Sequence, residues 1–326
     1  MKRKILLAAG LLALCAVVFV GWRATVLPKQ IQPTDCEITK GEIQKDPILY
    51  QALTVAGRTA YDTILEQIQS KSPGMVVFPE EISLSEYQRV RDCLLLELPE
   101  SVAVFPIFPM TDQYICVGGM EEAQQETQPE LVKQCLLWFY GSALTPDDVV
   151  IEDNQIKNVE QCVALLREYD STMTEALYRQ TDEAAAILDQ VVAALPDTFS
   201  QLEAVQQFVA WEIEHLNYAD CSHNFADFQS VVTTYNIPSS ILCADTGRGL
   251  CVGYAKVFQY LCLKAGIPCE IVYGRRLYND EGHAINKIHF GEEVYYLDTS
   301  DIHRADQIRY IAEDDLDKHL RPFSYS

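Results

Sequence analysis

The sequence predicts an α+β protein in which helices pack on a small antiparallel sheet, preceded by a smaller α/β module and an N-terminal transmembrane helix. Three features favour this fold: an apolar run of 18 residues near the start, helical spacing over much of 154–265, and two short strands around Gly291. With 326 residues, 48% of them hydrophobic, the chain is long enough for one or two domains. The composition excludes a largely disordered chain and a minimal disulfide-dependent scaffold.

Acidic side chains outnumber basic ones, with 47 Asp and Glu against 25 Lys and Arg. Residues 1–30 hold five of the basic side chains and no acidic one, so the rest of the chain carries a formal charge of −27. Such a body repels nucleic acid and anionic membrane surfaces, and neither is expected as a partner. The charge indicates solubility in a salty exterior or, as the alternative, recognition of a cationic partner.

Residues 1–28 are typical of a membrane anchor. Lys2–Lys4 precede the apolar run Ile5–Trp22, which as a helix would span about 27 Å and nearly cross a bilayer. Gly21–Ala24 is a poor cleavage site, so a retained single-pass anchor fits better than a cleaved signal peptide. A lipoprotein box at Leu12–Cys15 is the alternative, although a leucine precedes the cysteine where a small residue is expected. The basic cluster favours a cytoplasmic N-terminus and an extracytoplasmic body.

Residues 29–45 are predicted to be a spacer, and residues 46–153 an accessory α/β module. Apolar spacing predicts a first helix over 48–68, and Ser83–Glu86 is a capping box that starts a second helix over 87–96. Further elements are expected as strands at 102–107 and 113–117, a loop at 121–128 and a helix at 129–140. The module shows no catalytic constellation.

Residues 154–326 are predicted to form a second domain with its preceding helices. Two helices are expected between 154 and 195, separated near Asp170–Thr172. A third helix is expected from the capping box Thr198–Gln201 to about Leu216. A loop then continues as far as Gly249.

The next helix carries the candidate nucleophile, Cys251. It is predicted from Cys251 to Ala265, because Gly266 and Pro268 are typical of residues that end a helix. A cysteine reacts as thiolate, so its pKa must fall from about 8.5 to about 4 to 7 for activation at neutral pH. A helix N-terminus supplies only about 0.3 to 1 kcal/mol of that stabilisation, so a cationic partner such as histidine is needed.

His283 is the candidate partner of this cysteine. Two strands are predicted at 283–289 and 294–298, joined by a two-residue loop that would be a type II′ hairpin. This register pairs Ile285 with Asp298 and makes His283 and Asp298 diagonal neighbours, about 5 to 8 Å apart between Cβ atoms. Asp298 would then orient the imidazole ring and favour its charged form. Other registers are left open.

The chain has 11 cysteines, and their spacing shows no disulfide framework. Cys93, Cys135 and Cys262 stand in apolar runs and are expected to be small buried hydrophobes. Cys221 and His223 hint at metal ligands, but no second pair at finger spacing completes a zinc site. Neither a metal nor a cofactor is therefore expected, and the histidines other than His283 are expected to be structural or solvated.

The last third of the chain resembles the transglutaminase-like superfamily over about residues 199–305. Four motifs in the family's order carry the resemblance: Gly249-Leu250-Cys251-Val252-Gly253-Tyr254-Ala255, Gly266-Ile267-Pro268, Gly282-His283-Ala284-Ile285-Asn286 and Tyr296-Leu297-Asp298-Thr299-Ser300. The resemblance implies a papain-like α+β core with Cys251, His283 and Asp298 as the catalytic triad. Ile285 replaces the family's usual aromatic residue, and Ser300-Asp301 replaces its Thr-Trp, which bears on substrate selection.

The predicted function is thiol-dependent acyl transfer or hydrolysis on a peptide or side-chain amide, by a membrane-anchored, extracytoplasmic protein of bacterial type. Cys251 would attack the carbonyl, His283 would protonate the departing amine, and Asp298 would hold His283. The Cys251 backbone N–H is one expected oxyanion donor. Water as acceptor gives a peptidase or deamidase, and an amine gives crosslinking. The alternative is a non-catalytic cell-surface binding module on the same fold.

Overall fold

The residues that the computed structural model describes are 31–41, 49–70, 82–83, 86–87, 89–90, 93–94, 98, 146–152, 155–156, 159–219, 237–302 and 308–323. The anchor predicted at 1–28 lies outside them, as do the elements predicted at 102–107, 113–117, 121–128 and 129–140. Within the described residues, no helix is long and apolar enough to span a bilayer. These residues form helices and strands, which confirms the predicted mixture of the two.

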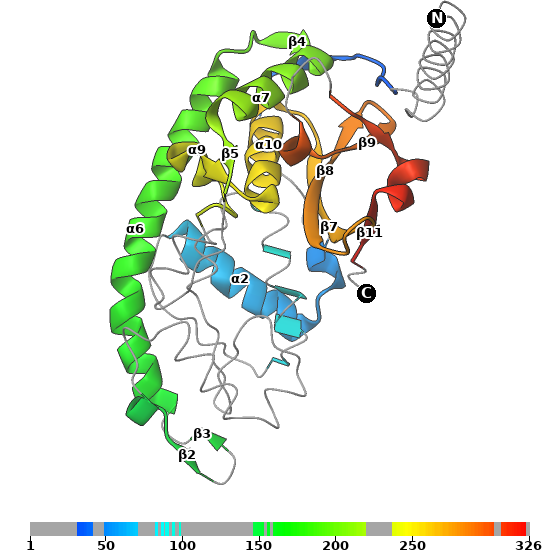
Figure 1. Ribbon diagram of the computed structural model, residues 1–326. Helices are drawn as coiled ribbons and strands as arrows, with labels where there is room; N and C mark the ends of the chain where they lie inside the picture. Colours follow the sequence, from blue (N-terminus) through cyan, green and yellow to red (C-terminus); the bar gives the residue numbers. More distant parts are fainter. Residues whose placement is uncertain are drawn as a thin grey trace, which may run out of the picture.

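A single long helix, α6 (Val159–Ala193), runs along one side of the molecule (Figure 1). Two helices separated near Asp170–Thr172 were expected here, and that expectation is wrong. The residues at the expected break contain neither glycine nor proline, and their helix propensities lie only about 0.7 kcal/mol or less below that of alanine. Such weak preferences do not interrupt a helix of 35 residues.

The next helix is α7 (Gln201–His215), and its N-cap lies two residues after Thr198, the first residue of the predicted capping box. Ser200 is the N-cap, and its Oγ accepts a hydrogen bond of 3.1 Å from the backbone N–H of Glu203. Thr198 and Ser200 both lie in strand β4 (Thr198–Ser200), but only Ser200 directly precedes the first residue of the helix. The Gln201 side chain instead donates to the His289 carbonyl, which ties α7 to the sheet.

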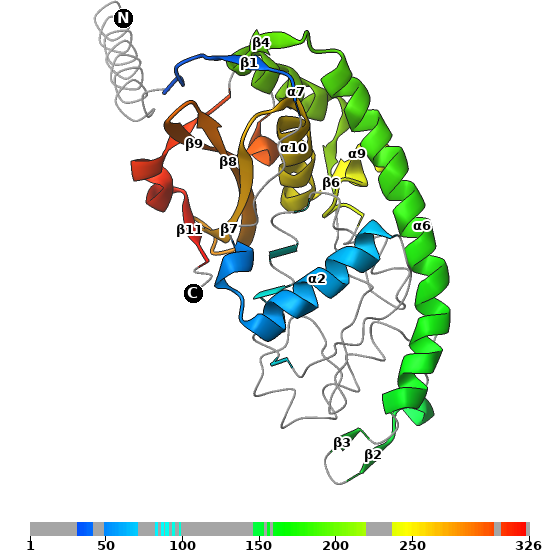
Figure 2. The same cartoon turned by 180° about the vertical axis from the view of Figure 1, so that it is seen from behind.

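Residues 31–41 are part of the folded body, although the sequence assigns them to a spacer. Strand β1 (Glu37–Thr39) pairs antiparallel with β4, and Figure 2 shows the two strands side by side. The Asp35 carboxylate accepts hydrogen bonds from the Leu202 N–H and the Ser200 hydroxyl. A strand of three residues has too little alternation to be recognised in the sequence, so this pairing was not predicted.

Helix α10 (Cys251–Ala265) has the predicted bounds. It ends at Gly266, whose φ of 93° is the left-handed conformation that glycine adopts most easily. In Figure 1 the helix lies between α6 and the sheet. Buried apolar residues of all three elements form one cluster there, among them Leu188, Phe258 and Ile288.

A five-stranded antiparallel sheet has the strand order β10-β9-β8-β7-β11. Its strands are β7 (Cys269–Arg276), β8 (Gly282–Phe290), β9 (Glu293–Leu297), β10 (Ile311–Ala312) and β11 (Leu320–Pro322). Phe290 pairs with Glu293, which confirms the predicted hairpin register. Gly291 has a φ of 59°, and Glu292 does not have a positive φ, as a type II′ turn requires.

The two faces of this sheet have different neighbours. Helix α10 packs on one face, where Ala255 clusters with Ile271 and Ala284. Because side chains alternate along a strand, Ile285 lies on the opposite face, where it clusters with Leu320. The sheet therefore separates the α10 side from a second apolar surface.

Helix α2 (Val55–Gln69) follows the short η1 (Leu49–Ala52), where one helix over 48–68 was expected. Thr54 caps α2, and the Glu86 carboxylate accepts hydrogen bonds from the Thr54 N–H and hydroxyl at 2.6 and 2.8 Å. Ser83 accepts from the Glu86 N–H at 3.2 Å, as the predicted capping box requires. The glutamate of that box thus serves a different helix.

Short elements complete the described chain. They are η3 (Pro146–Asp148), β2 (Ile151–Glu152), β3 (Gln155–Ile156), β5 (Asn217–Tyr218), α9 (Cys243–Thr246), β6 (Arg248–Gly249), η5 (Thr299–Asp301) and η7 (Glu313–Lys318). Strands β5 and β6 pair in parallel within the region predicted as a loop. This pairing places Tyr218 beside Gly249, two residues before Cys251.

Candidate active site

Cys251 is the first residue of α10 and is partly buried. Gly253, in the same turn, packs against the backbone of Pro238, because a Cβ at this position would lie 2.0 Å from the Pro238 carbonyl oxygen. The same carbonyl accepts a hydrogen bond of 2.7 Å from the Leu250 N–H. The glycine after the cysteine therefore allows the preceding loop to fix the start of the helix.

His283 and Asp298 meet at the ends of β8 and β9, as the confirmed register requires. His283 Nε2 lies 2.6 Å from Asp298 Oδ2. The second carboxylate oxygen, Oδ1, accepts a hydrogen bond of 2.7 Å from the Ser300 hydroxyl. His283 is only 6% exposed, so its ring is held by its neighbours with little contact with water.

The Cys251 thiol interacts with the His283 ring and with the Ala284 backbone N–H. Because Nε2 of the ring contacts Asp298, the nitrogen that remains for the thiol is Nδ1. The three predicted side chains thus lie in one row, in the order thiol, imidazole and carboxylate. Their roles in catalysis stay predictions.

The electrostatics of this row favour a thiolate beside an imidazolium. Burial acts to raise the pKa of Cys251, but the interaction with His283 outweighs it and lowers that pKa below 9.0. Burial acts to lower the pKa of His283, but hydrogen bonds with Asp298 and Cys251 raise it to about 9. The pKa of Asp298 falls despite its burial, chiefly because of His283. All three shifts favour the charged forms.

Arg276 joins this row, and the sequence did not predict it. Its guanidinium lies 3.0 Å from Asp298 Oδ2 and 2.7 Å from His283 Nε2. A charged imidazole and a guanidinium can both donate to the same carboxylate oxygen, so Asp298 holds two cations together. Strand β7, which positions Arg276, was not among the predicted elements. The pairing of β7 with β8, which could have indicated this contact, was therefore not predicted either.

Tyr218 is a second residue that the sequence did not indicate. Its hydroxyl lies next to the Cys251 thiol, whose pKa it helps to lower. The side chain is 58% exposed and stacks on Tyr254, with 6.4 Å between ring centroids. The parallel pairing of β5 with β6 brings it here, and a pairing between two-residue strands leaves no readable pattern in a sequence.

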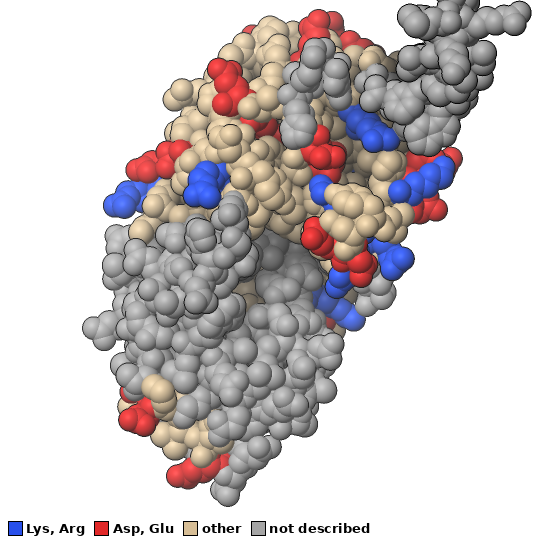
Figure 3. Space-filling model, in the orientation of Figure 1, with Lys and Arg blue, Asp and Glu red and all other residues tan. Residues whose placement is uncertain are grey.

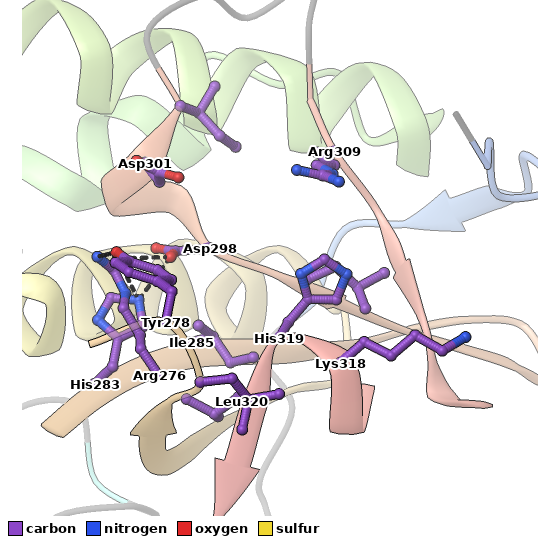
Figure 4. Close-up of a pocket in the computed structure, with 13 residues that line it drawn as sticks. Arg276, Tyr278, His283, Ile285, Asp298, Asp301, Arg309, Lys318, His319 and Leu320 are labelled. Atoms are coloured by element: carbon purple, nitrogen blue, oxygen red, sulfur yellow. Dashed lines mark hydrogen bonds and ion pairs between the residues drawn. The ribbon is translucent and has the colours of Figure 1, made fainter. Parts of the chain in front are cut away.

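A pocket of about 600 Å³ opens beside His283, Asp298 and Arg276 (Figure 4). Cys251 is not among the described residues that line it. Ile285 and Leu320 contribute apolar surface between the two ends of the pocket. The described lining therefore includes the imidazole and the carboxylate of the row but not its thiol.

The other described cysteines differ from Cys251 in burial or in the direction of the pKa shift: Cys36 is also partly buried, but burial raises its pKa. Cys93, Cys243, Cys262 and Cys269 are buried, which confirms the expectation for Cys93 and Cys262, whereas Cys135 lies outside the described residues. In the described ranges, no three His, Cys, Asp or Glu side chains are grouped as a metal site would require.

Residues 185–312 match the transglutaminase-like superfamily in a comparison with protein families. This match confirms the resemblance read from the four motifs and extends beyond 199–305 at both ends. A search of curated proteins found no match to this sequence.

Solved structures offer only distant likenesses. A candidate cysteine protease from Cytophaga hutchinsonii is 16% identical, with a TM-score of 0.26, over 40% of this chain and 41% of that one. A TGase structure is 16% identical, with a TM-score of 0.30, over 44% and 37%. Calcium-bound LapG from Legionella pneumophila is 15% identical, with a TM-score of 0.30, over 45% and 76%. The chain thus spans about two fifths of the first two proteins.

Proposed function

We propose that the transglutaminase-like domain formed by residues 185–312 is a cysteine-dependent enzyme that transfers or hydrolyses the acyl group of a peptide or side-chain amide. The observation that carries the proposal is the row of Cys251, His283 and Asp298. Within it the pKa of the thiol is lowered and that of the imidazole is raised to about 9. This pattern supplies both a nucleophile and a proton donor near neutral pH.

The reaction begins with attack of the Cys251 thiolate on the amide carbonyl carbon. As the carbon–nitrogen bond breaks, His283 donates the Nδ1 proton to the departing amine, and a thioester forms on Cys251. Water or an incoming amine then attacks the thioester carbonyl and gives a proton back to His283. Asp298 holds the ring in position through both steps, as its contact of 2.6 Å with Nε2 supports, and Arg276 holds Asp298 through an ion pair of 3.0 Å.

The oxyanion of this reaction needs hydrogen-bond donors near the start of α10. The Cys251 backbone N–H is suitable, and the Tyr218 hydroxyl occupies the place beside it. A substrate carbonyl oxygen takes this place, and the exposed Tyr218 side chain moves aside to donate its own hydroxyl proton. Two donors aimed at the developing charge provide the usual arrangement for acyl transfer.

The test is incubation of the full protein with a peptide library, with and without an added primary amine, followed by mass spectrometry. Hydrolysis adds water to a cleaved or deamidated peptide, and transfer adds the mass of the amine with loss of ammonia or of a peptide fragment. Cys251→Ala is the control and should give neither product. If wild type and Cys251→Ala give the same product pattern, the thiol is not the nucleophile and the proposal fails.

We also propose that residues 1–28 anchor the protein to the membrane and leave its body extracytoplasmic. The basic Lys2–Lys4 and the apolar Ile5–Trp22 support this arrangement. Membrane fractionation of the full chain and of a variant without residues 1–28 tests the anchor. A C-terminal reporter that is active only outside the cytoplasm tests the orientation, and an inactive reporter on a membrane-bound chain contradicts it.

A further inference from the structure

The pocket beside the imidazole ring has two chemically different ends. At one end lie His283, Asp298 and Arg276, and at the other Arg309 and His319 (Figure 4). Ile285, Ile311 and Leu320 belong to the apolar cluster on this face of the sheet and also line the pocket. The pocket therefore offers an apolar path from the catalytic row to a basic end.

The basic end contrasts with the rest of the protein. The chain has a formal net charge of −22, yet Arg309 and Lys318 both line the pocket. Figure 3 shows basic side chains over the region of the C-terminal strands, among acidic ones. Lys318 forms an ion pair with Asp315, whereas Arg309 is exposed and forms no ion pair with any described residue.

The charges that line the pocket suit a single negative charge. Among the described lining residues, Arg276, Arg309 and Lys318 are basic and Asp298 and Asp301 are acidic, so the lining carries one more basic than acidic side chain. Arg276 pairs with Asp298 inside the lining, and Asp315, which pairs with Lys318, lies outside it. Burial, and after it the nearby Arg309 guanidinium, lower the pKa of His319, whereas Asp315 acts to raise it. Asp301 would oppose a doubly charged phosphate more strongly than a carboxylate.

The position of the pocket relates it to one half of the substrate. In the proposed reaction the acyl carbon bonds to the Cys251 sulfur, and the amine leaves beside the His283 ring that protonates it. The pocket is lined by His283 but not by Cys251, so far as the structure describes the chain. It borders the ring that protonates the amine, so a leaving group that extends past this ring enters the pocket.

We propose that this pocket binds the leaving-group side of the substrate, and that Arg309 and Lys318 recognise a carboxylate carried by that side. The inference rests on the proposed function. A carboxylate of this kind has two sources, the C-terminus of a short peptide or an acidic side chain near the scissile bond. Both present the same charge to the two basic side chains.

The experiment measures how fast Cys251 is alkylated by paired bromoacetamides on the full protein. In each pair the bromoacetyl group carries an alkyl tail that ends in a carboxylate or in the uncharged carboxamide, and the tail length is varied. The thiolate displaces bromide and forms a thioether, which mass spectrometry locates and times. Because the protein is acidic, its overall charge repels the carboxylate probe and makes that probe alkylate Cys251 more slowly than the carboxamide probe. We expect the reverse order at one tail length, by about fivefold, because an exposed ion pair contributes up to about 1 kcal/mol.

Variants assign this preference to the pocket. Arg309→Gln with Lys318→Gln should reduce the carboxylate-to-carboxamide rate ratio to one or below. Arg309→Gln alone should also lower the ratio, and Arg179→Gln is its matched control, because it too removes one Arg charge, from the exposed surface of α6, and should retain the wild-type ratio. A preference that persists in the double variant, or that is absent in wild type at every tail length, overturns the inference.

A second pair of probes distinguishes the two sources of the carboxylate. Bromoacetyl-glycylglycine carries it at the main-chain end, and bromoacetyl-glutamic acid α-amide, in which only the side-chain carboxylate is left free, carries it on a side chain. The probe that labels Cys251 faster identifies the source of the carboxylate. Slower labelling by either probe in the double variant supports the pocket as its binding site.

Iodoacetamide separates failure of this inference from failure of the proposed function. Fast labelling of wild-type Cys251, with equal rates for the paired probes, overturns only the carboxylate subsite. Labelling no faster than that of an ordinary cysteine overturns the activated thiol and the subsite together.

Discussion

The two ends of helix α10 each carry a cysteine, and their surroundings give these thiols opposite properties. Cys251, in the first turn, is partly buried and has a lowered pKa because of His283. Cys262, in the last turn, is fully buried, and this burial together with its neighbour Cys269 raises its pKa well above 9.0. The same residue type in one helix is thus a candidate nucleophile at one end and a core side chain at the other.

The helix dipole explains only a small part of this difference. It favours a thiolate at the N-terminus and disfavours one at the C-terminus, by about 0.3 to 1 kcal/mol in each case. The larger causes are the access of water to each thiol and the groups beside it. Cys251 faces an imidazole held by Asp298, whereas Cys262 faces a second thiol and the buried Glu212. Reactivity therefore follows from what the fold places beside each sulfur.

Replacement of each cysteine by alanine should give the largest contrast. Cys251→Ala should reduce amide turnover at least about a thousandfold, because no other described thiol faces an imidazole. Cys262→Ala should retain turnover and lose about 1 to 2 kcal/mol of unfolding free energy to the small cavity that it leaves. Peptide turnover and chemical denaturation measure the two effects. Equal loss of turnover in both variants would falsify the assignment of the nucleophile.

Removal of the imidazole should make the two ends of the helix more alike. His283→Ala should slow amide turnover about a hundredfold or more, because it removes the proton donor and the charge that stabilises the thiolate. The pKa of Cys251, followed by the pH dependence of iodoacetamide labelling, should rise towards 9.0. If the pH dependence of labelling stays unchanged in His283→Ala, the imidazole does not lower the pKa of Cys251.

The wild-type pH profile adds a check with a definite sign. Turnover should rise with pH as Cys251 ionises and fall as the pH passes about 9, where His283 loses its proton. The same raised pKa stabilises the folded state fully below 6.5, and this stabilisation is lost as the pH rises through about 9. A turnover that continues to increase above pH 10 would indicate that protonated His283 is not required.

The packing of the first turn can be tested without a change in charge. In Gly253→Ala the new Cβ would lie 2.0 Å from the Pro238 carbonyl oxygen, a backbone atom that cannot rotate away. We expect a loss of about 1 to 3 kcal/mol in unfolding free energy and slower labelling of Cys251. Gly282→Ala is the matched control, because nothing lies within 4 Å of a Cβ at that position. Similar stability in the two variants would contradict the close approach of the loop.

The smallest effect is expected near the Cys262 end, at Glu212. This side chain is 1% exposed, and burial raises the pKa of its carboxyl well above 4.5. The folded state therefore favours the protonated acid, and its contribution to stability declines as the pH rises above 4.5. Glu212→Gln should match wild type near pH 4.5 and exceed its unfolding free energy by about 1 kcal/mol at pH 8. The exposed Glu214→Gln on the same helix should show no such trend.

Elements with local signals were predicted well. Helix α10 has a glycine and a proline just beyond its end, and the β8–β9 hairpin has a two-residue glycine turn, so both could be placed from short stretches of sequence. The diagonal contact between His283 and Asp298 followed from that register. Elements without local signals were missed, such as the pairing of β1 with β4 and the continuity of α6 through Asp170–Thr172.

Residues that reach the site from distant elements could not be predicted either. Tyr218 depends on a parallel pairing of two short strands, and Arg276 depends on β7, which was not predicted. Arg309 and Lys318 come from the last part of the chain, and no pattern in that part indicates that they share a pocket with His283. Side chains of this kind are brought together only by packing.

The sequence by itself determined which residues can do chemistry and where the helix and the hairpin that carry them begin and end. Those features depend on turns, caps and alternation, which act over a few neighbouring residues. The tertiary structure decided which thiol meets an imidazole, which carboxyl group is buried, and where positive charge gathers in an acidic protein. Electrostatic effects depend on distance and on access to water, and both are set by contacts between residues far apart in the chain.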